Sequence, residues 1–154
     1  MSEVTIVEPK AVALAGRLSQ RHIYMVQDKL KEQAPVQTET EHLWAHGVYL
    51  RVLKVPADTV VVGECHGTEH ITLLLKGSCT ITEPRTGELT RVTAPMYCVT
   101  PAGEKKMVLT HEECWFANVH PDPDNKRDED EVRQRVIIPE TDHRLAVTKV
   151  AALT

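Results

Sequence analysis

The chain has few aromatic residues, no paired cysteine motif and no long hydrophobic run, and each absence excludes a class of protein. With two Trp, three Tyr and one Phe in 154 residues, a core must be built from Val, Leu and Ile, and the β-branched residues among these favour strands. The four cysteines form no C-x-x-C pair and no dense disulfide spacing, which predicts a reducing intracellular compartment. No run reaches the length of a membrane span, and the polar N-terminus lacks the features of a signal peptide.

The charge balance excludes two further kinds of partner. The 22 acidic and 18 basic residues give a formal net charge of -4, which argues against nucleic acid or an anionic membrane as the main partner. Apolar residues make up 42% of the chain, enough to fill a sizeable core in one domain with terminal extensions. We therefore expect neither membrane binding nor direct nucleic-acid binding.

An amphipathic helix is expected between Leu18 and Gln33, ahead of the main domain. Ile23, Val26 and Leu30 recur at helical spacing, with Lys, Gln and Asp on the opposite face. Such a helix packs on its own domain or on a neighbouring subunit, and we assign these three apolar residues to an interface. The residues before the helix are expected to form an extended arm.

From Gly47 to His120 the chain predicts an all-β domain. Short runs rich in Val, Leu, Ile and Thr alternate with turn residues such as Gly77 and Gly87, without a helical interruption. Strands this short and this regularly spaced are typical of a sandwich or barrel. The expected strands are 48–55, 59–62, 70–75, 79–82, 88–92, 96–100, 107–110 and 114–119.

A charge-dense segment, DPDNKRDEDE at residues 122–131, follows the last expected strand. It is interpreted either as an acidic interaction tail or as a solvated connector, and the second interpretation is the commoner one for such a run. Apolar character returns at 132–138 and 144–153, so we expect an ordered C-terminal arm. The expected organisation is an arm and helix at 1–46, a barrel at 47–120, and a charged linker and arm at 121–154.

The stretch from Gly63 to Gly77, GECHGTEHITLLLKG, carries the strongest chemical signal. Two histidines, two carboxylates and a thiol fall within seven positions, immediately before an apolar run. Imidazole and carboxylate together form the ligand set of a non-thiol metal site. Glu64 and His66 are two residues apart, which places both on one face of a strand, and His70 approaches after a turn.

These features resemble the first motif of the cupins, a family of small jelly-roll barrels. That motif runs Gly, five residues, His-x-His, three or four residues, Glu, six residues, Gly. Counted back from the closing Gly77, His70 takes the position of the family's glutamate. His66 takes the position of the second histidine, and Glu64 that of the first.

The second cupin motif, with its Pro-x-Gly turn, resembles residues 101–103 (PAG). Three residues beyond that glycine, where the family has a metal-binding histidine, this chain has Lys106. An ammonium group offers no lone pair to a metal and repels a divalent cation. We therefore expect Lys106 to pair with Glu64 or Glu69 in a polar cluster at the barrel mouth, in place of a metal.

The resemblance covers residues 47–120 and implies an all-β, cupin-type jelly-roll barrel, here with an N-terminal amphipathic helix and flanking arms. More narrowly, the order of features resembles small cupin-like proteins encoded by tailed bacteriophages. The shared features are a helix before the barrel, GVYLRVLKVPA, H-x-x-E-H, a strand ending in Lys-Gly, PAG-x-K-K, and a late Trp followed by Val-His. This closer resemblance implies a virion component that assembles in the host cytoplasm.

Three functional hypotheses follow. The first is a non-catalytic assembly protein, a capsid or tail accessory of a bacteriophage virion, which contacts copies of itself and other virion proteins and needs no cofactor. The second is a metal-dependent enzyme of the dioxygenase or isomerase type, with iron, manganese or zinc held by Glu64, His66 and His70. The third is a cytoplasmic small-ligand binding module with a metal-free pocket at the barrel mouth.

The other histidines receive structural interpretations. His42 and His46 flank Trp44 just ahead of the barrel, and we expect them to pack or to lie at the surface. His120 ends the last expected strand and is interpreted as structural. No Ser-His-Asp arrangement, phosphate-binding loop or dinucleotide fingerprint is present.

Overall fold

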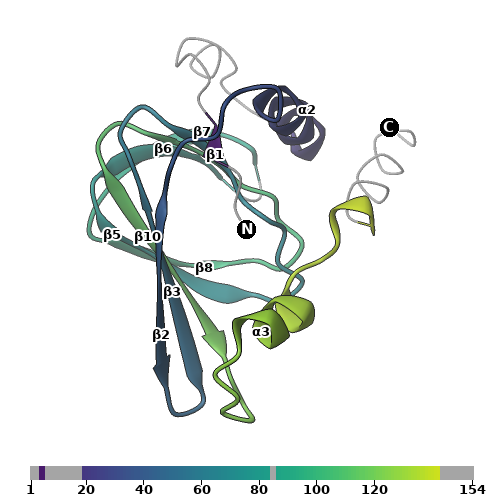
Figure 1. The fold of residues 1–154 in the computed structure, drawn as a ribbon. Helices are drawn as coiled ribbons and strands as arrows, with labels where there is room; N and C mark the ends of the chain where they lie inside the picture. Colours follow the sequence, from purple (N-terminus) through teal and green to yellow (C-terminus); the bar gives the residue numbers. More distant parts are fainter. Residues whose placement is uncertain (1–3, 6–18, 84–85, 143–154) are drawn as a thin grey trace.

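The computed structural model describes residues 4–5, 19–83 and 86–142, which form two five-stranded antiparallel sheets and two helices (Figure 1). The strand order is β1-β4-β9-β6-β7 in the first sheet and β2-β3-β10-β5-β8 in the second. From β3 onward the chain passes back and forth between the sheets, so the predicted all-β jelly-roll fold is confirmed. The elements are β1 (Val4–Thr5), α2 (Gln20–Leu30), β2 (Glu39–Ala45), β3 (Val48–Val55), β4 (Val60–Val62), β5 (His70–Lys76), β6 (Ser78–Thr82), β7 (Leu89–Thr93), β8 (Met96–Thr100), β9 (Met107–Thr110), β10 (Cys114–Pro121) and α3 (Glu129–Val136).

The strands β3 to β10 correspond one to one to the strands expected from the sequence, with ends that agree to within two residues. The turn between β5 and β6 depends on Gly77. Its φ of +90° is one that residues with a side chain rarely adopt. A Cβ at this position would also collide with the backbone carbonyl of Glu113.

The three central strands of the second sheet, β3, β10 and β5, sort their inward-facing side chains into rows. Pairing places Leu53, Phe116 and Leu74 side by side, which makes one row apolar. The next row consists of Arg51, Asn118 and Thr72. Because side chains alternate between the two faces of a strand, both rows point into the barrel. The interior is therefore apolar toward one end and polar toward the other.

Helix α2 begins at its N-cap Ser19 and packs on the outside of the first sheet. Ile23 is 0% exposed, Leu30 is also buried, and Val26 packs beside them. Their partners in the sheet are Val60, Val62, Met107 and Leu109. The helix therefore packs on the protein's own domain through these three residues, which is the first of the two arrangements expected from the sequence.

The sequence did not predict β2. This strand pairs with β3 along its whole length and extends the second sheet into the segment assigned to the N-terminal arm and helix. Its sequence, ETEHLWA, has polar residues on both faces, so the hydrophobic alternation that identifies a half-buried strand is missing.

The sequence also did not predict α3, which begins inside the charged segment 122–131. The side chain of Asp128 accepts hydrogen bonds from the backbone N–H groups of Asp130 and Glu131 at the start of the helix. Acidic residues fill the first turn and two arginines the last, as the helix dipole favours. The last three residues of this segment therefore belong to a helix, while most of the segment is exposed to solvent.

Two sequence predictions fall largely outside the described residues. These are the extended arm before residue 18, of which only β1 is described and pairs with β4, and the apolar run at 144–153. Within the part of the chain that the structure describes, no helix is long and apolar enough to cross a membrane.

Replacing Ile23 with alanine should destabilise the protein by about 2–4 kcal/mol, because the change removes buried methyl groups and leaves a cavity between α2 and the first sheet. Met25 on the same helix is 58% exposed and provides a matched control. Met25→Ala should change the free energy of unfolding by less than about 0.5 kcal/mol. Urea denaturation of the two variants and the wild type measures both effects, and equal stabilities of the variants would contradict the packing of α2.

Candidate ligand-binding site

The polar end of the barrel contains a cavity of about 140 Å³. Arg51, Thr72 and Asn118 line it from the second sheet, and Lys106 lines it from the residue before β9. Its apolar wall is formed by Leu53, Val61, Val108 and Phe116. Glu64 and Glu104 also line the polar side. The cavity therefore combines a charged and hydrogen-bonding side, which carries two cations and two carboxylates, with a hydrocarbon side.

Lys106 begins a chain of hydrogen bonds across the cavity wall. Its ammonium Nζ donates to the hydroxyl of Thr100 at 2.6 Å, and Thr100 lies 2.7 Å from the hydroxyl of Thr72. The Thr72 hydroxyl donates to Oδ1 of Asn118 at 3.1 Å, so Thr100 must be the donor to Thr72. Burial lowers the pKa of Lys106, although Cys98 and nearby carboxylates act in the opposite direction.

The carboxylates expected to pair with Lys106 lie elsewhere. Glu69 is exposed and is not part of the cavity wall. Both oxygens of Glu64 accept hydrogen bonds from another cation, as described below. Among the described residues, no carboxylate oxygen lies within 4 Å of the Lys106 ammonium. The expected ion pair at the barrel mouth is thus replaced by a bond to the neutral Thr100.

Three histidines meet beside this cavity. Nδ1 of His66 and Nε2 of His70 are 3.0 Å apart, and Nδ1 of His70 lies 3.2 Å from the carbonyl oxygen of Thr68. Since a carbonyl only accepts, Nδ1 of His70 carries the proton, and His66 donates to the free lone pair on Nε2 of His70. The ring of His120 completes the cluster, with centroids 5.0 Å from His66 and 5.1 Å from His70.

The imidazoles of this cluster are held neutral. Burial, followed by the neighbouring imidazoles, lowers the pKa of His66 to about 3. Burial and then His70 lower the pKa of His120 to about 4. Burial also lowers the pKa of His70, against a raising hydrogen bond from the backbone of Thr68. Nδ1 of His120 is buried and has no hydrogen-bond partner among the described residues.

Helix α3 covers this end of the barrel and holds the loop that carries His66. Arg133 donates two hydrogen bonds of 2.7 Å to the two carboxylate oxygens of Glu64. The backbone N–H of Gly67 donates to the carbonyl of Val136 at 2.7 Å. Since Glu64 and Gly67 flank His66, these contacts fix the position of its imidazole at the cavity.

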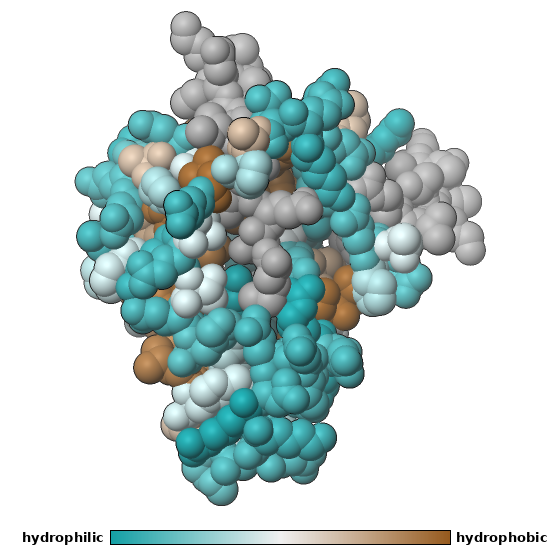
Figure 2. Space-filling view, in the orientation of Figure 1, coloured by the Kyte–Doolittle hydropathy of each residue, from teal (hydrophilic) through white to brown (hydrophobic). Residues whose placement is uncertain are grey.

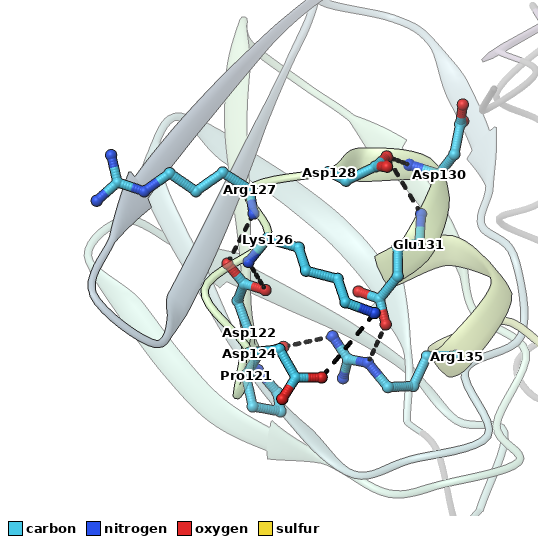
Figure 3. A network of polar contacts seen from close by, with 9 residues as sticks. All are labelled: Pro121, Asp122, Asp124, Lys126, Arg127, Asp128, Asp130, Glu131 and Arg135. Carbon is cyan, nitrogen blue, oxygen red and sulfur yellow. Dashed lines mark hydrogen bonds and ion pairs between the residues drawn. The ribbon is translucent and has the colours of Figure 1, made fainter.

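A second polar network fixes α3 to the end of β10 (Figure 3). The buried carboxylate of Asp122 accepts from the backbone N–H groups of Lys126 and Arg127 at 3.1 and 3.0 Å. Arg135 donates to the carbonyl of Pro121 at 2.6 Å and pairs with Glu131 one turn earlier at 3.3 Å. The charges that suggested a solvated connector therefore organise a tight turn and dock the helix.

The predicted metal ligands do not fit a metal centre in this arrangement. His66 and His70 are adjacent, but their facing nitrogens share a hydrogen bond, and the Glu64 carboxylate is bound on both oxygens by Arg133. The Lys106 ammonium lines the same cavity. Within the described part of the chain, no group of three or more His, Cys, Asp or Glu side chains could hold a metal ion.

Several residues of the site were not singled out from the sequence. Arg51, Thr72 and Asn118 lie in strands whose limits were predicted. The alternation of side chains along each strand indicates which residues share a face, but the strand pairing is needed to bring these three together. Arg133 had no such signal, because it lies 69 residues from Glu64 on a helix that was not expected. His120 was expected to be structural, but it lies within the histidine cluster.

The chain is similar over part of its length to several solved structures. No family model matches the chain, and no curated protein matches it. Among solved structures, it is similar to the polyketide cyclase RemF from Streptomyces resistomycificus, with 23% identity over 55% of this chain and 64% of that one, at a TM-score of 0.47. The chain thus spans slightly less than two thirds of the length of this cyclase.

Two further similar structures are a cupin superfamily protein from Desulfitobacterium hafniense and an acetylacetone dioxygenase from Acinetobacter johnsonii. The first shares 14% identity over 55% of this chain and 77% of that one, at a TM-score of 0.46. The second shares 17% identity over 55% and 59%, at a TM-score of 0.43. The activities in these names belong to those proteins.

Lowering the pH should destabilise the protein through the histidine cluster. His66 and His120 have folded-state pKa values of about 3 and about 4, below the unfolded value of about 6.5. At pH values between the folded-state and unfolded-state pKa, the unfolded chain binds more protons than the folded protein. The free energy of unfolding that is present above pH 6.5 is therefore lost as the pH falls. The expected loss is about 1–3 kcal/mol per pH unit for the two groups together.

Urea denaturation between pH 7 and pH 5 measures this slope. His120→Gln should flatten it, because one of the buried imidazoles is removed. His46→Gln replaces an exposed imidazole and should leave the slope unchanged. If the wild type and His120→Gln had the same slope, the buried imidazole of His120 would not contribute to the dependence of stability on pH.

Arg133→Ala should destabilise α3 by about 1 kcal/mol, because a bidentate pair that is about one-third exposed is stronger than an ordinary surface pair but still screened by solvent. Lys126→Ala is the matched control, since Lys126 is half exposed and lies 3.9 Å from Asp124; it should change stability by less than about 0.5 kcal/mol. Amide hydrogen exchange in residues 129–136 is the measurement. Equal exchange rates in both variants would show that the Glu64 pair does not hold the helix.

Proposed function

We propose that the protein is a non-catalytic binding module that holds a small organic acid in the polar end of its barrel. The observation that carries this proposal is the cationic side of the cavity, where the Lys106 ammonium is hydrogen-bonded to the neutral Thr100. Lys106 is half-buried, and no carboxylate oxygen lies within 4 Å of its ammonium among the described residues, so the more distant carboxylates, which include Glu104, offset its desolvation only in part. A ligand carboxylate beside Lys106 would offset that cost and would also face Arg51.

The chemistry of the cavity wall favours an acid with a short hydrocarbon body. Thr72, Thr100 and Asn118 offer hydroxyl and amide groups next to Lys106. The opposite wall is apolar and includes Leu53 and Phe116. A cavity of about 140 Å³ suits a molecule of only a few carbon atoms, with its carboxylate toward Lys106 and its hydrocarbon part against the apolar wall.

The metal-dependent enzyme is less well supported. Glu64 would have to leave Arg133 before it could serve as a metal ligand, and the Arg133 guanidinium would then lose two charge-assisted hydrogen bonds. Lys106 would then repel the incoming cation. The organic-acid proposal requires neither change.

The assembly role expected from the sequence is a second candidate. The observation that favours it is an exposed apolar surface on the outer face of the second sheet, with Tyr97, Val99 and Ile71 among its members, because large exposed patches mark interaction sites. A bacteriophage virion as the setting is supported by the sequence resemblance alone. This role and ligand binding involve opposite faces of the sheet, so one protein can have both.

Thermal denaturation with butyrate tests the organic-acid proposal, with butyramide as the uncharged molecule of the same shape. Butyrate should raise the melting temperature and butyramide should not, since only the carboxylate pairs with Lys106. Lys106→Met should abolish the stabilisation. Lys54→Met, which removes a lysine paired with Glu39 and Glu41 on the outer face, should retain it.

Three results would overturn the proposal. The first is equal stabilisation by butyrate and butyramide, and the second is a butyrate effect that survives in Lys106→Met. The third is stoichiometric iron, manganese or zinc in the purified protein by elemental analysis, because this would restore the metal-dependent alternative.

A further inference from the structure

The outward-facing side chains of the second sheet form two apolar rows. Strand pairing places Val99, Ile71 and Val119 side by side on β8, β5 and β10. The same row continues through Leu50 on β3 to Leu43 on β2, so it crosses all five strands. The adjacent row consists of Tyr97, Leu73, Ala117 and Val52. We call these nine residues the outer apolar face.

The outer apolar face is large for the surface of a monomer. Tyr97 is 80% exposed, Val99 61% and Ile71 48%. Leu43 is 53% exposed, and only Val52 and Ala117 of the nine are fully buried. Together with Val48 at the margin, which is 41% exposed, these side chains form one contiguous apolar surface, and large contiguous surfaces of this kind mark interaction sites. A standard interface buries about 800 Å² on each partner, which requires a continuous surface, and this face crosses all five strands of the second sheet.

The charges beside the apolar rows allow a second copy to approach. Lys54 donates to Glu39 and Glu41 at 3.0 and 2.7 Å, and Lys76 donates to Glu113 at 3.0 Å. The margin of the face thus carries both positive and negative charges, and these are paired with each other within one chain. Two copies of this margin can therefore lie near each other without net repulsion, whereas a strongly charged partner would gain little from it.

The edge strand β8 also favours a second copy of the chain as the partner. Its sequence, MYCVT, contains no charged residue, although β8 ends the strand order of the second sheet. Exposed edge strands usually carry charges that prevent association. The opposite edge, β2, has two glutamates and a histidine, and the lower end of the molecule in Figure 2, which includes the β2–β3 hairpin, is hydrophilic. The uncharged and apolar end of the sheet is therefore the end near β8.

We propose that two copies of this chain associate through their outer apolar faces, in a symmetric contact centred on Ile71, Tyr97 and Val99. A symmetric contact brings the same patch of each copy together, so a continuous apolar surface is self-complementary. Two sheets that pack face to face interdigitate their side chains at about 10 Å separation. This inference is independent of ligand binding, and it deepens the assembly candidate by naming the surface and a second copy as its partner.

Light scattering coupled to size-exclusion chromatography tests the contact. The wild type should have twice the chain mass of 17.3 kDa. The double variant Tyr97→Lys/Val99→Lys should have the monomer mass, because a dimer would bury four unpaired ammonium groups. Met25→Lys places the same charge at an exposed apolar residue on α2 and should remain dimeric. A monomeric wild type at high micromolar concentration, or a double variant that stays dimeric, would overturn the proposal.

A second measurement on the wild type avoids any effect of substitution on folding. Hydroxyl-radical labelling of Tyr97 should be low at high protein concentration and should increase severalfold after about a hundredfold dilution. Labelling of Met25 should be the same at both concentrations. Concentration-independent labelling of Tyr97 would overturn the contact. The butyrate response of the folded double variant should equal that of the wild type, so failure of ligand binding and failure of dimerisation are seen separately.

Discussion

The antiparallel register of β3, β10 and β5 is the constraint on which both faces of the second sheet depend. It places Arg51, Asn118 and Thr72 in one inward-facing row, directly beside the apolar row that fills the rest of the barrel. The same pairing aligns Ile71 and Val119 on the outside. Because the side-chain period of a strand is two, a slip of one residue would exchange these faces. Cavity and outer surface are thus specified by one set of backbone hydrogen bonds.

The polar end of the barrel also depends on a segment that is distant in sequence. Arg133 reaches Glu64 from α3, and the backbone of the same segment binds Gly67 on the other side of His66. These contacts add to two backbone hydrogen bonds with the segment before β9, in which the Gly63 N–H donates to the Lys106 carbonyl and the Gly103 N–H donates to the His66 carbonyl. The histidine cluster is therefore positioned jointly by the second sheet, the segment before β9 and α3, and the salt bridge that occupies Glu64 is one of the contacts that order the site.

The sequence predicted the barrel better than the site within it. Strands β3 to β10 were recognised because their apolar runs are separated by turn residues, and one of these, Gly77, has a conformation that only glycine adopts easily. β2 and α3 were missed because their surface charges mask the usual hydrophobic pattern. The partner of Lys106 was predicted as Glu64 or Glu69, but it is Thr100. Spacing in the sequence shows which side chains can lie near Lys106, but the partner that it binds depends on long-range packing. Here Arg133 on α3 binds both oxygens of Glu64.

The electrostatics of the site explain how neutral imidazoles and cations share one small volume. Burial is the largest cause that lowers the pKa of His66 and His120, and nearby positive charges add to it. Neutral imidazoles beside the half-buried Lys106 ammonium add no repulsion to it. A carboxylate bound at Lys106 would act in the opposite direction and raise the pKa of each of these groups. Binding of an organic acid and uptake of a proton would therefore strengthen each other, and the same cluster that weakens the free protein in acid would favour its complex.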